Sequence, residues 1–327
     1  MKTLLTNTVT EMQIGEAQQA HNLTIFPLFA ASDGGPDYLT LPEALRQGNV
    51  TITEVNPSGS VSSLIALNRG DAAVLGLDGE ELRGAKQNRV LNTTIMFGAR
   101  SQLVIPVSCT ERGRWAYSSA VFSDSDEMTP HKIREQKMRS VHRSLQTEGR
   151  HRADQRRVWE AIDRDHRRHK VFAQTGAMRD TYRAKASDLE KYMQALKKHS
   201  KQCGLLAFVN GKAAGCDLLS RPAAYQKMHS KLVRSYALDA LAERSEDTDK
   251  PVQDAAVQDF VAQAQQCTQK EFASVGLGTD VRLESPAMIG SALVVDQTVV
   301  HLALIAADPD NSTGHRASDR MRRNWRR

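Results

Sequence analysis

Residues 187–219 read SDLEKYMQALKKHSKQCGLLAFVNGKAAGCDLL, and within this stretch the hydrophobic pattern changes from that of a helix to that of strands. The helix is predicted by apolar residues at positions i, i+3, i+4 and i+7, which are Leu189, Tyr192, Met193 and Leu196. Ser187 and Glu190 are predicted to form a capping box at its start. Two apolar runs then flank Asn210-Gly211, a pair that supplies the positive φ values of a type I′ turn. The stretch therefore predicts a helix followed by a β-hairpin.

The sequence on both sides of this stretch places strands before and after a helical middle. Runs rich in β-branched and aliphatic residues predict strands at 23–28, 50–55, 61–67, 72–77, 92–96 and 103–107, with a short helix at 41–47 capped by Thr40. After a polar break at 123–127 the pattern is helical to about residue 200. Apolar stripes at 225–236 and 257–264 predict two more helices, and strands are predicted at 288–295 and 298–305. We expect an α+β fold: a β-rich N-terminal platform, a helical middle insertion and C-terminal strands that return to the sheet.

The length of 327 residues allows one large domain with an insertion, or two smaller domains. We predict a single domain over residues 1–307, made of a β-rich part (1–122), a basic helical part (123–203) and an α+β part (204–307). Residues 308–327 contain six Arg against three Asp and almost no apolar side chains, which predicts a basic, disordered tail.

Composition excludes several classes of protein. The chain is 40% hydrophobic and 25% charged, enough to form a core and too polar to be embedded in a membrane. No stretch has the apolar length of a signal peptide or a membrane span, so we expect a cytoplasmic protein with no membrane partner. The four cysteines include no Cys-x-x-Cys pair, which argues against a zinc knuckle and against a dense disulfide framework.

The formal charge of +6 is unevenly placed along the chain. Residues 131–170 hold 13 Lys or Arg against 6 Asp or Glu. One interpretation is a solvated helical face, and the alternative is a patch that binds the phosphates of a nucleic acid. Trp159 is the only aromatic residue of this segment, so it lacks the stacking side chains of a single-strand binding platform. Nucleic-acid binding through 131–170 and the Arg-rich tail therefore remains an alternative.

The densest polar cluster between apolar strands is residues 77–95, LDGEELRGAKQNRVLNTTI. On an extended backbone Glu80 and Glu81 point to opposite faces, and we take Glu80 as the candidate catalytic carboxylate. The candidate ligand-binding residues are Arg83, Lys86, Gln87, Asn88, Arg89 and Asn92, which would hold phosphate oxygens and hydroxyl groups. The alternative is a polar loop whose side chains cap its own backbone.

A second cluster is residues 105–115, IPVSCTERGRW. A thiol beside arginines can have a lowered pKa and act as a nucleophile, so Cys109 is a catalytic candidate, although buried structural cysteines are commoner. Glu111 is a candidate general acid or base. Arg114 and Trp115 are candidate ligand-binding residues, with core packing as the alternative for Trp115. Glycine-rich nucleotide loops and zinc-protease motifs are missing from the sequence, so we identify no metal ligand and assign no cofactor.

These two motifs together resemble the ARG-and-rhodanese-phosphatase-superfamily-associated protein domain, in which ARG stands for ADP-ribosylglycohydrolase. The resemblance extends from about residue 10 to 307 and includes Asp154-Gln155 with Trp159-Glu160, residues 175–178, the Asn210-Gly211 hairpin and residues 234–240. The family is named for an association with proteins that handle ADP-ribose, so the resemblance implies a role near NAD-derived or ADP-ribose-linked metabolism.

We therefore predict that residues 78–94 and 105–115 form one polar pocket for a nucleotide-like or ADP-ribose-like small molecule. Two alternatives stay open for that pocket. In the first the protein is a hydrolase that uses Glu80, Cys109 and Glu111, and in the second it is a non-catalytic sensor of the ligand.

Overall fold

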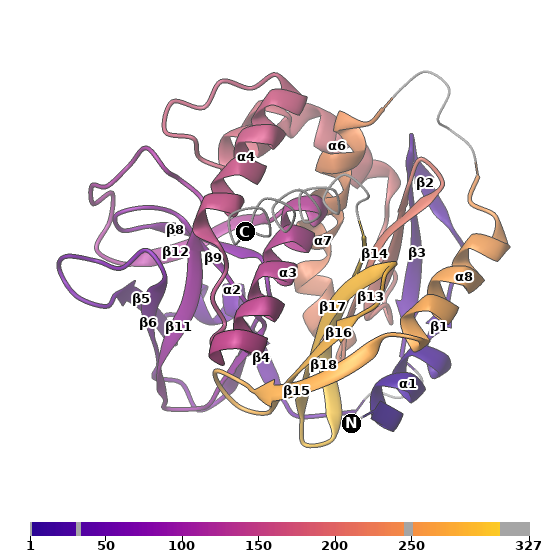
Figure 1. The fold of residues 1–327 in the computed structure, drawn as a ribbon, viewed down its shortest axis with the longest axis horizontal. Helices are drawn as coiled ribbons and strands as arrows, with labels where there is room; N and C mark the ends of the chain where they lie inside the picture. Colours follow the sequence, from indigo (N-terminus) through magenta and orange to yellow (C-terminus); the bar gives the residue numbers. More distant parts are fainter. Residues whose placement is uncertain (1, 31–33, 245–250, 308–327) are drawn as a thin grey trace, which may run out of the picture.

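The chain folds around helices that stand between a large sheet and a smaller β-rich platform (Figure 1). The computed structural model describes residues 2–30, 34–244 and 251–307. The strands before and after the helical middle do join one sheet, so the expected α+β class is confirmed. The predicted tail at 308–327 lies outside the described residues.

The large sheet has nine strands, in the order β1-β3-β13-β14-β18-β17-β16-β15, with β2 paired to β3. Its pairings are antiparallel throughout. The strands are β1 (Gln13–Ile14), β2 (Gln18–Ala20), β3 (Leu23–Phe29), β13 (Gly204–Val209), β14 (Lys212–Leu219), β15 (Thr268–Ala273), β16 (Thr279–Glu284), β17 (Met288–Val295) and β18 (Thr298–Ala306).

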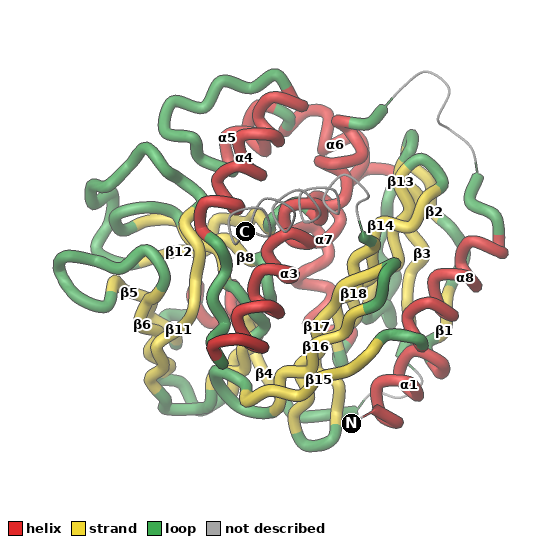
Figure 2. Tube along the Cα trace, viewed as in Figure 1, coloured by secondary structure: helices red, strands yellow, loops and turns green. Residues whose placement is uncertain are grey.

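The N-terminal platform consists of a three-stranded and a six-stranded sheet. The first has the order β10-β7-β4 and the second β12-β8-β9-β11-β6-β5. The strands are β4 (Tyr38–Thr40), β5 (Val50–Glu54), β6 (Ser63–Asn68), β7 (Ala73–Gly76), β8 (Glu80–Gly84), β9 (Arg89–Leu91), β10 (Ile95–Phe97), β11 (Gln102–Cys109) and β12 (Phe122–Met128). Figure 2 shows long loops at the outer end of this platform, and these loops carry part of the site described below.

Helices cover both faces of the large sheet, and the short helix α2 packs on the platform strands β4, β5, β7 and β12. Between that sheet and the platform stand α3 and α7, of which α3 packs on β17 and β18 while α7 contacts both β14 and β12 (Figure 1). On the opposite face α1 and α8 cover β18 and β14. The helices are α1 (Lys2–Glu11), α2 (Leu41–Arg46), α3 (His131–Glu148), α4 (Gln155–His169), α5 (Arg179–Ala184), α6 (Ala186–Ala195), α7 (Pro222–Ala242) and α8 (Asp254–Gln265).

Most of the predicted elements occur where the sequence places them. The 204–219 hairpin turns at Asn210 (φ 51°) and Gly211 (φ 73°), as a type I′ turn requires. The backbone N–H and hydroxyl of Thr40 both donate to the carboxylate of Glu43, which fixes the start of α2. The capping box at Ser187 is wrong, because α5 runs almost directly into α6 and Ser187 lies inside that helix.

The structure also contains elements that the sequence patterns did not predict. These are α1, the short strands β1, β2 and β4, the two outer strands β15 and β16, the strands β8 and β9 inside the first polar cluster, and β12, which occupies the predicted polar break. Of these, β8, β9 and β12 matter for function, because they position the candidate site. No helix in the described part of the chain combines the length and the hydrophobicity needed to cross a bilayer.

Candidate functional site

The two polar motifs meet because β8, β9 and β11 are consecutive neighbours in the six-stranded sheet. Leu82 of β8 pairs with Arg89 of β9, and Arg89 pairs with Cys109 of β11. Gly84 ends β8 with φ 131°, and an added Cβ there would lie 2.5 Å from Ser119 Oγ and 2.8 Å from the Val121 carbonyl oxygen. Only glycine therefore lets the turn after β8 approach the loop before β12 so closely.

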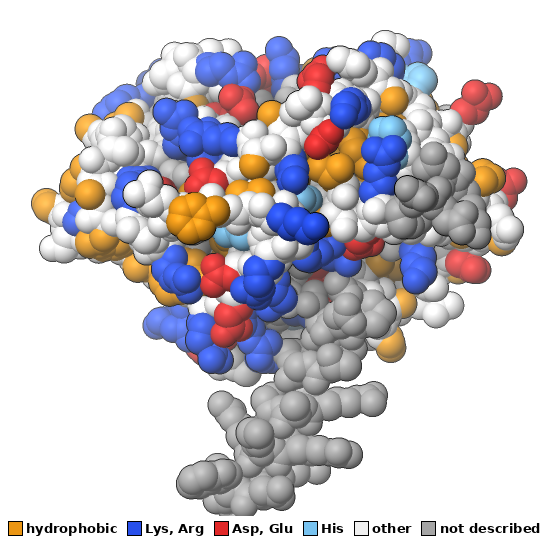
Figure 3. Space-filling view, turned by 90° about the horizontal axis from the view of Figure 1, so that it is seen from above, with side chains coloured by type: hydrophobic (Ala, Val, Ile, Leu, Met, Phe, Trp, Pro, Cys, Tyr) orange, Lys and Arg blue, Asp and Glu red, His pale blue; other side chains and the backbone are white. Residues whose placement is uncertain are grey.

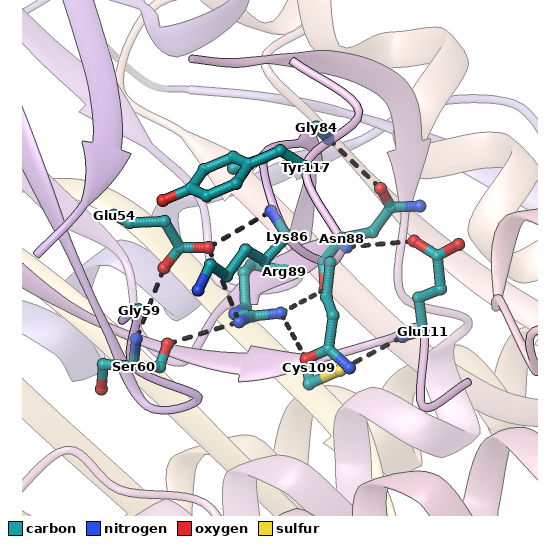
Figure 4. A network of polar contacts seen from close by, with 12 residues as sticks. Glu54, Gly59, Ser60, Gly84, Lys86, Asn88, Arg89, Cys109, Glu111 and Tyr117 are labelled. Atoms are coloured by element: carbon teal, nitrogen blue, oxygen red, sulfur yellow. Dashed lines mark hydrogen bonds and ion pairs between the residues drawn. The ribbon is translucent and has the colours of Figure 1, made fainter. Parts of the chain in front are cut away.

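Arg89 is the buried centre of this region, with no solvent-exposed surface. Its guanidinium donates to Gln87 Oε1 at 3.0 Å and to the Ser60 carbonyl oxygen at 3.3 Å, and it lies 4.0 Å from the carboxylate of Glu54 (Figure 4). Burial lowers the pKa of Arg89. These contacts tie the β8–β9 turn to the loop after β5, so Arg89 serves first as a structural anchor.

Glu111 and Arg114 form a second anchor on the other side of the turn. Arg114 donates to Glu111 Oε2 at 2.6 Å and to the Ala85 carbonyl oxygen at 2.6 Å. Glu111 also accepts the backbone N–H of Asn88 at 3.3 Å and the hydroxyl of Thr175 at 3.0 Å. The β8–β9 turn, the end of β11 and the loop before α5 are therefore held together by one carboxylate.

Cys109 lies beneath these groups and is fully buried. Burial raises the pKa of its thiol, and the nearby Arg89 guanidinium, which acts in the opposite direction, does not outweigh it. The expectation of a lowered pKa at Cys109 is wrong for this reason. The sulfur accepts the backbone N–H of Glu111 at 3.4 Å, which is the behaviour of a packed thiol and not of a nucleophile open to substrate.

The exposed part of the site consists of Lys86, Trp115 and Tyr117, which we call the aromatic platform. The Lys86 ammonium lies 5.2 Å from the ring centroid of each aromatic residue, and it donates to the Ser58 carbonyl oxygen at 2.8 Å. Trp115 is 48% exposed and Tyr117 is 54% exposed, so core packing does not account for Trp115. Arg89 lies just behind, with its guanidinium carbon 5.8 Å from the Trp115 ring. Figure 4 shows Tyr117, Lys86 and Arg89 on the same side of the cluster.

Three candidate residues lie away from this convergence. Glu80 is on the opposite face of β8, where it accepts Lys231 Nζ at 2.9 Å and the Leu77 backbone N–H at 2.7 Å. Asn92 accepts the Ser108 hydroxyl at 2.7 Å and donates to the His151 carbonyl oxygen at 3.2 Å. Arg83 is exposed on the face of β8 that also carries Glu81. The other candidates, Lys86, Gln87, Asn88, Arg89, Cys109, Glu111, Arg114 and Trp115, lie together.

Glu81 is the carboxylate that sequence reasoning passed over in favour of Glu80. It is fully buried, and it accepts the Thr110 hydroxyl at 2.7 Å, so it is the glutamate of β8 that faces the second motif. Burial raises its pKa to about 7. Glu127 of β12 behaves alike: burial raises its pKa to about 7, and Arg234 of α7 donates to it at 2.9 Å. The alternation of faces along β8 was visible in the sequence, but which face meets Arg179 of α5 was not.

The interior behind the site contains a network of buried charges. Lys137 of α3 pairs with Asp78, and Arg134 donates to both oxygens of Asp217 at 2.7 Å. His301 lies between the two pairs: its Nδ1 is 2.8 Å from Thr94 Oγ1 and its Nε2 is 3.3 Å from Asp217. Asp78 and Thr94, the two ends of the first motif, are thereby fixed to α3 and β18. In the described residues no group of three or more His, Cys, Asp or Glu is arranged to hold a metal ion.

Fold and site together define an α+β protein whose polar centre is built where a β-hairpin meets the end of a neighbouring strand. The chain belongs to the family of the ARG and Rhodanese-Phosphatase-superfamily-associated Protein domain, whose model matches residues 11–305, and the resemblance seen in the two motifs is thereby confirmed. No curated protein and no solved structure matches the chain. The name of the family records an association and not a reaction, so function has to be argued from the site.

Proposed function

We propose that this protein binds a nucleotide-like or ADP-ribose-like small molecule on the aromatic platform. The observation that carries the proposal is the position of the Lys86 ammonium 5.2 Å from two aromatic rings that each keep about half of their surface exposed. Exposed rings offer stacking surfaces for a base, and an adjacent cation attracts a phosphate. The Lys86 ammonium donates its hydrogen bond to a neutral carbonyl oxygen, that of Ser58, which a phosphate oxygen could replace.

The loops that present the platform are already fixed before any ligand arrives. Arg89 and its partners anchor the turn that carries Lys86, and the Glu111–Arg114 pair anchors the segment that leads to Trp115. Arg114 adds a hydrogen bond to the Ala116 carbonyl oxygen at 2.8 Å, directly beside that tryptophan. Because a preorganised surface loses little conformational entropy on binding, this arrangement favours a ligand-binding role over a merely structural one.

The test is isothermal titration calorimetry with ADP-ribose, NAD and AMP. Trp115→Ala and Lys86→Met are compared with Val104→Ala and Lys212→Ala, which remove exposed side chains on other strands. We expect binding of at least one ligand by the wild type, and a loss of about ten-fold or more in affinity in each platform variant, as for removal of a stacking aromatic residue. Equal binding by all five proteins, or by none, overturns the proposal.

A second candidate function is nucleic-acid binding, and one feature favours it. A groove of about 400 Å³ between the C-terminal half of α3 and the start of α4 is lined by four arginines, Arg139, Arg143, Arg152 and Arg157. It also holds the buried hydroxyl of Ser144, which has no hydrogen-bond partner. Acidic residues also line the groove. Figure 3 shows the molecule from the side on which α4 and α6 lie, and acidic side chains are visible there among the Lys and Arg side chains.

Fluorescence anisotropy with short RNA and DNA, repeated over a range of salt concentrations, tests this second candidate. Nucleic-acid binding predicts an affinity that falls steeply as salt rises, because phosphate contacts release counterions. It also predicts that Arg143→Ala with Arg152→Ala weakens binding while Trp115→Ala does not. An affinity that is absent at low salt, or unchanged in the double variant, excludes the groove.

A further inference from the structure

Two buried glutamates meet beside the second motif at an irregularity in the sheet. Glu81 is on β8 and Glu127 is on β12, and the register of these two strands shifts between Asp124 and Met128. Met128 pairs with Glu80 beyond the bulge, so Glu127 lies beside Glu81 on the same face of the sheet, and each carboxylate is among the charges that act on Arg179. One oxygen of Glu81 accepts the Thr110 hydroxyl, and one oxygen of Glu127 accepts Arg234.

The other oxygen of each carboxyl has no partner. Glu81 Oε2 and Glu127 Oε2 are buried and make no hydrogen bond, and the same is true of Arg179 Nε at the start of α5. Buried polar atoms are nearly always paired, because an unpaired one loses its hydration without compensation. Three unpaired atoms that belong to mutually interacting side chains therefore indicate a place for an additional polar group, either a water molecule or a ligand atom.

Three arginines lie on the solvent side of this carboxyl pair. Arg179 is only partly buried and interacts electrostatically with Arg83 and Arg183, both of which are exposed. Arg83 was expected to bind a phosphate next to Lys86, and the structure places it here instead. A cationic rim attracts anions to the surface directly above the carboxyl pair.

We propose that Glu81 and Glu127 are an acid–base pair that hydrolyses a glycosidic bond in the phosphate-bearing ligand, with Arg83, Arg179 and Arg183 receiving its phosphate. This inference rests on the proposed function and deepens it, because it names the bond and the groups that act on it. It replaces Glu80, which pairs with Lys231, and Cys109, whose raised thiol pKa leaves little thiolate at neutral pH. Glu111 links the pair to the aromatic platform. It accepts the Asn88 N–H, and it follows Thr110, whose hydroxyl donates to Glu81.

The protonation states fit such a step. Burial raises the pKa of both carboxyls to about 7, and Glu81 contributes to the increase at Glu127. Two interacting carboxyls of this kind share one proton near neutral pH and titrate as a pair. In the proposed step Glu81, which is bonded to hydroxyl groups, carries the proton, and Glu127, which faces the Arg234 guanidinium, is the ionised member.

The reaction balances with one water molecule as co-reactant. Ionised Glu127 takes a proton from the water molecule while the water oxygen forms a bond to the anomeric carbon. The bond from that carbon to the leaving group breaks, and the leaving atom keeps the electron pair and takes the proton of Glu81. The pair ends with one proton, now on Glu127, and is restored by proton exchange with solvent.

The experiment measures both turnover and binding. AMP, which carries a phosphate and has one glycosidic bond, to a base that takes up a proton as it leaves, is incubated with wild type, Glu81→Gln, Glu127→Gln and the control Glu271→Gln, an exposed carboxylate on β15, and the products are separated by chromatography. We expect a loss of about 100-fold or more in kcat in each pair variant, with AMP affinity within a few-fold of wild type. The wild-type rate should be bell-shaped around neutral pH, and each variant should lose one limb.

Infrared spectroscopy supplies a readout that does not depend on turnover. A protonated carboxyl band that titrates near pH 7 is expected in the wild type and in Glu271→Gln, and it should be weaker in each pair variant at the same pH. Asp165, whose pKa burial also raises to about 7, contributes to this band, so all four proteins are compared in an Asp165→Asn background. AMP that binds through Trp115 without being cleaved overturns the acid–base pair and leaves the proposed function standing. Absence of binding by every ligand overturns both. Unchanged kcat in either glutamine variant overturns the pair alone.

Discussion

The side-chain amide of Gln155 bonds to both backbone groups of Cys109. Its oxygen accepts the Cys109 N–H at 2.7 Å, and its nitrogen donates to the Cys109 carbonyl oxygen at 2.9 Å. A single residue at the first turn of α4 therefore completes the hydrogen bonding at the end of β11. The strand end that Gln155 fixes leads directly into Thr110 and Glu111. The Thr110 hydroxyl bonds to Glu81, and the Glu111 carboxylate holds the β8–β9 turn.

Gln155→Ala should lower the free energy of unfolding by about 1–3 kcal/mol, because it leaves a backbone donor and a backbone acceptor of Cys109 without partners. Urea denaturation measures the change. Gln194→Ala is the matched control, since that amide makes only a 3.4 Å contact with Glu190 on the exposed side of α6. If the two variants lose the same stability, the amide of Gln155 is not a structural clamp.

The thiol of Cys109 should react slowly in the native protein. It is fully buried and its pKa is raised, so little thiolate is present or accessible at neutral pH. We expect a variant that keeps Cys109 as its only cysteine to be labelled by an aromatic disulfide reagent at least about 100-fold more slowly than the same protein in denaturant. The reaction is followed by absorbance. Labelling of the folded protein at the rate of the denatured one would restore Cys109 as a nucleophile.

The parts of the fold that sequence could predict are those with local causes. The hairpin at 204–219 follows from Asn210-Gly211, whose positive φ values are required whatever packs around the turn. By contrast, β12 reads FSDSDEM, which is as polar as a loop. Its Asp124 is partly buried and its Glu127 is buried, because Lys231 and Arg234 of α7 pair with them from 107 residues further along the chain. A local sequence pattern cannot indicate a partner so distant, so the sequence predicts a polar break where β12 lies.

The candidate site shows the same division. The convergence of many motif residues follows from the pairing of β9 with β11, and the two motifs were singled out by their composition alone. The choice between Glu80 and Glu81 depended on which face of β8 meets Lys231 of α7 and which meets Arg179 of α5. Strand alternation shows that Glu80 and Glu81 lie on opposite faces, but it does not show what surrounds each face. The sequence therefore favours Glu80 as the catalytic carboxylate, although in the structure Lys231 already pairs with it.

Asp165→Asn should stabilise the protein increasingly as pH rises from about 4 to 7. Burial raises the pKa of Asp165 to about 7, and Asp239 adds to the increase. Below the unfolded-state pKa near 4 the group is neutral in both states, whereas between the two pKa values only the unfolded chain loses the proton, and the folded state becomes less stable. At about 1.4 kcal/mol for each pKa unit, the variant gains at most about 4 kcal/mol over wild type by pH 7.

Urea denaturation at three pH values between 4.5 and 7.5 checks this prediction. Glu160→Gln removes an exposed carboxylate from the same helix and should follow the wild-type profile. His169, which lies 3.5 Å from Asp165, has a pKa lowered by burial to about 4 and opposes the trend below about pH 6.5, so the upper half of the range is decisive. A constant difference between Asp165→Asn and wild type would show that Asp165 is ionised throughout.

The buried pair of Arg134 and Asp217 gives the opposite pH dependence. Burial acts to raise the pKa of Asp217, but the charge of Arg134 and the hydrogen bond with His301 outweigh it and hold that pKa well below its usual range. Arg134→Met leaves the carboxylate buried without its cation, so we expect a loss of about 3–5 kcal/mol at neutral pH. Adding Asp217→Asn should recover part of this loss, because no unpaired charge then remains.

The stability that Asp217 contributes is present above its unfolded-state pKa of about 4 and is lost as pH falls below that value. The difference in unfolding free energy between wild type and Arg134→Met should therefore shrink between pH 4 and pH 2. In this range Asp217 binds a proton in the unfolded chain but stays ionised in the folded wild type. Calorimetric unfolding over this range, with Arg183→Met as an exposed-arginine control, measures the effect. A difference that stays constant to the lowest pH, or a double variant less stable than Arg134→Met alone, would mean that the arginine stabilises the core by packing and not by its charge.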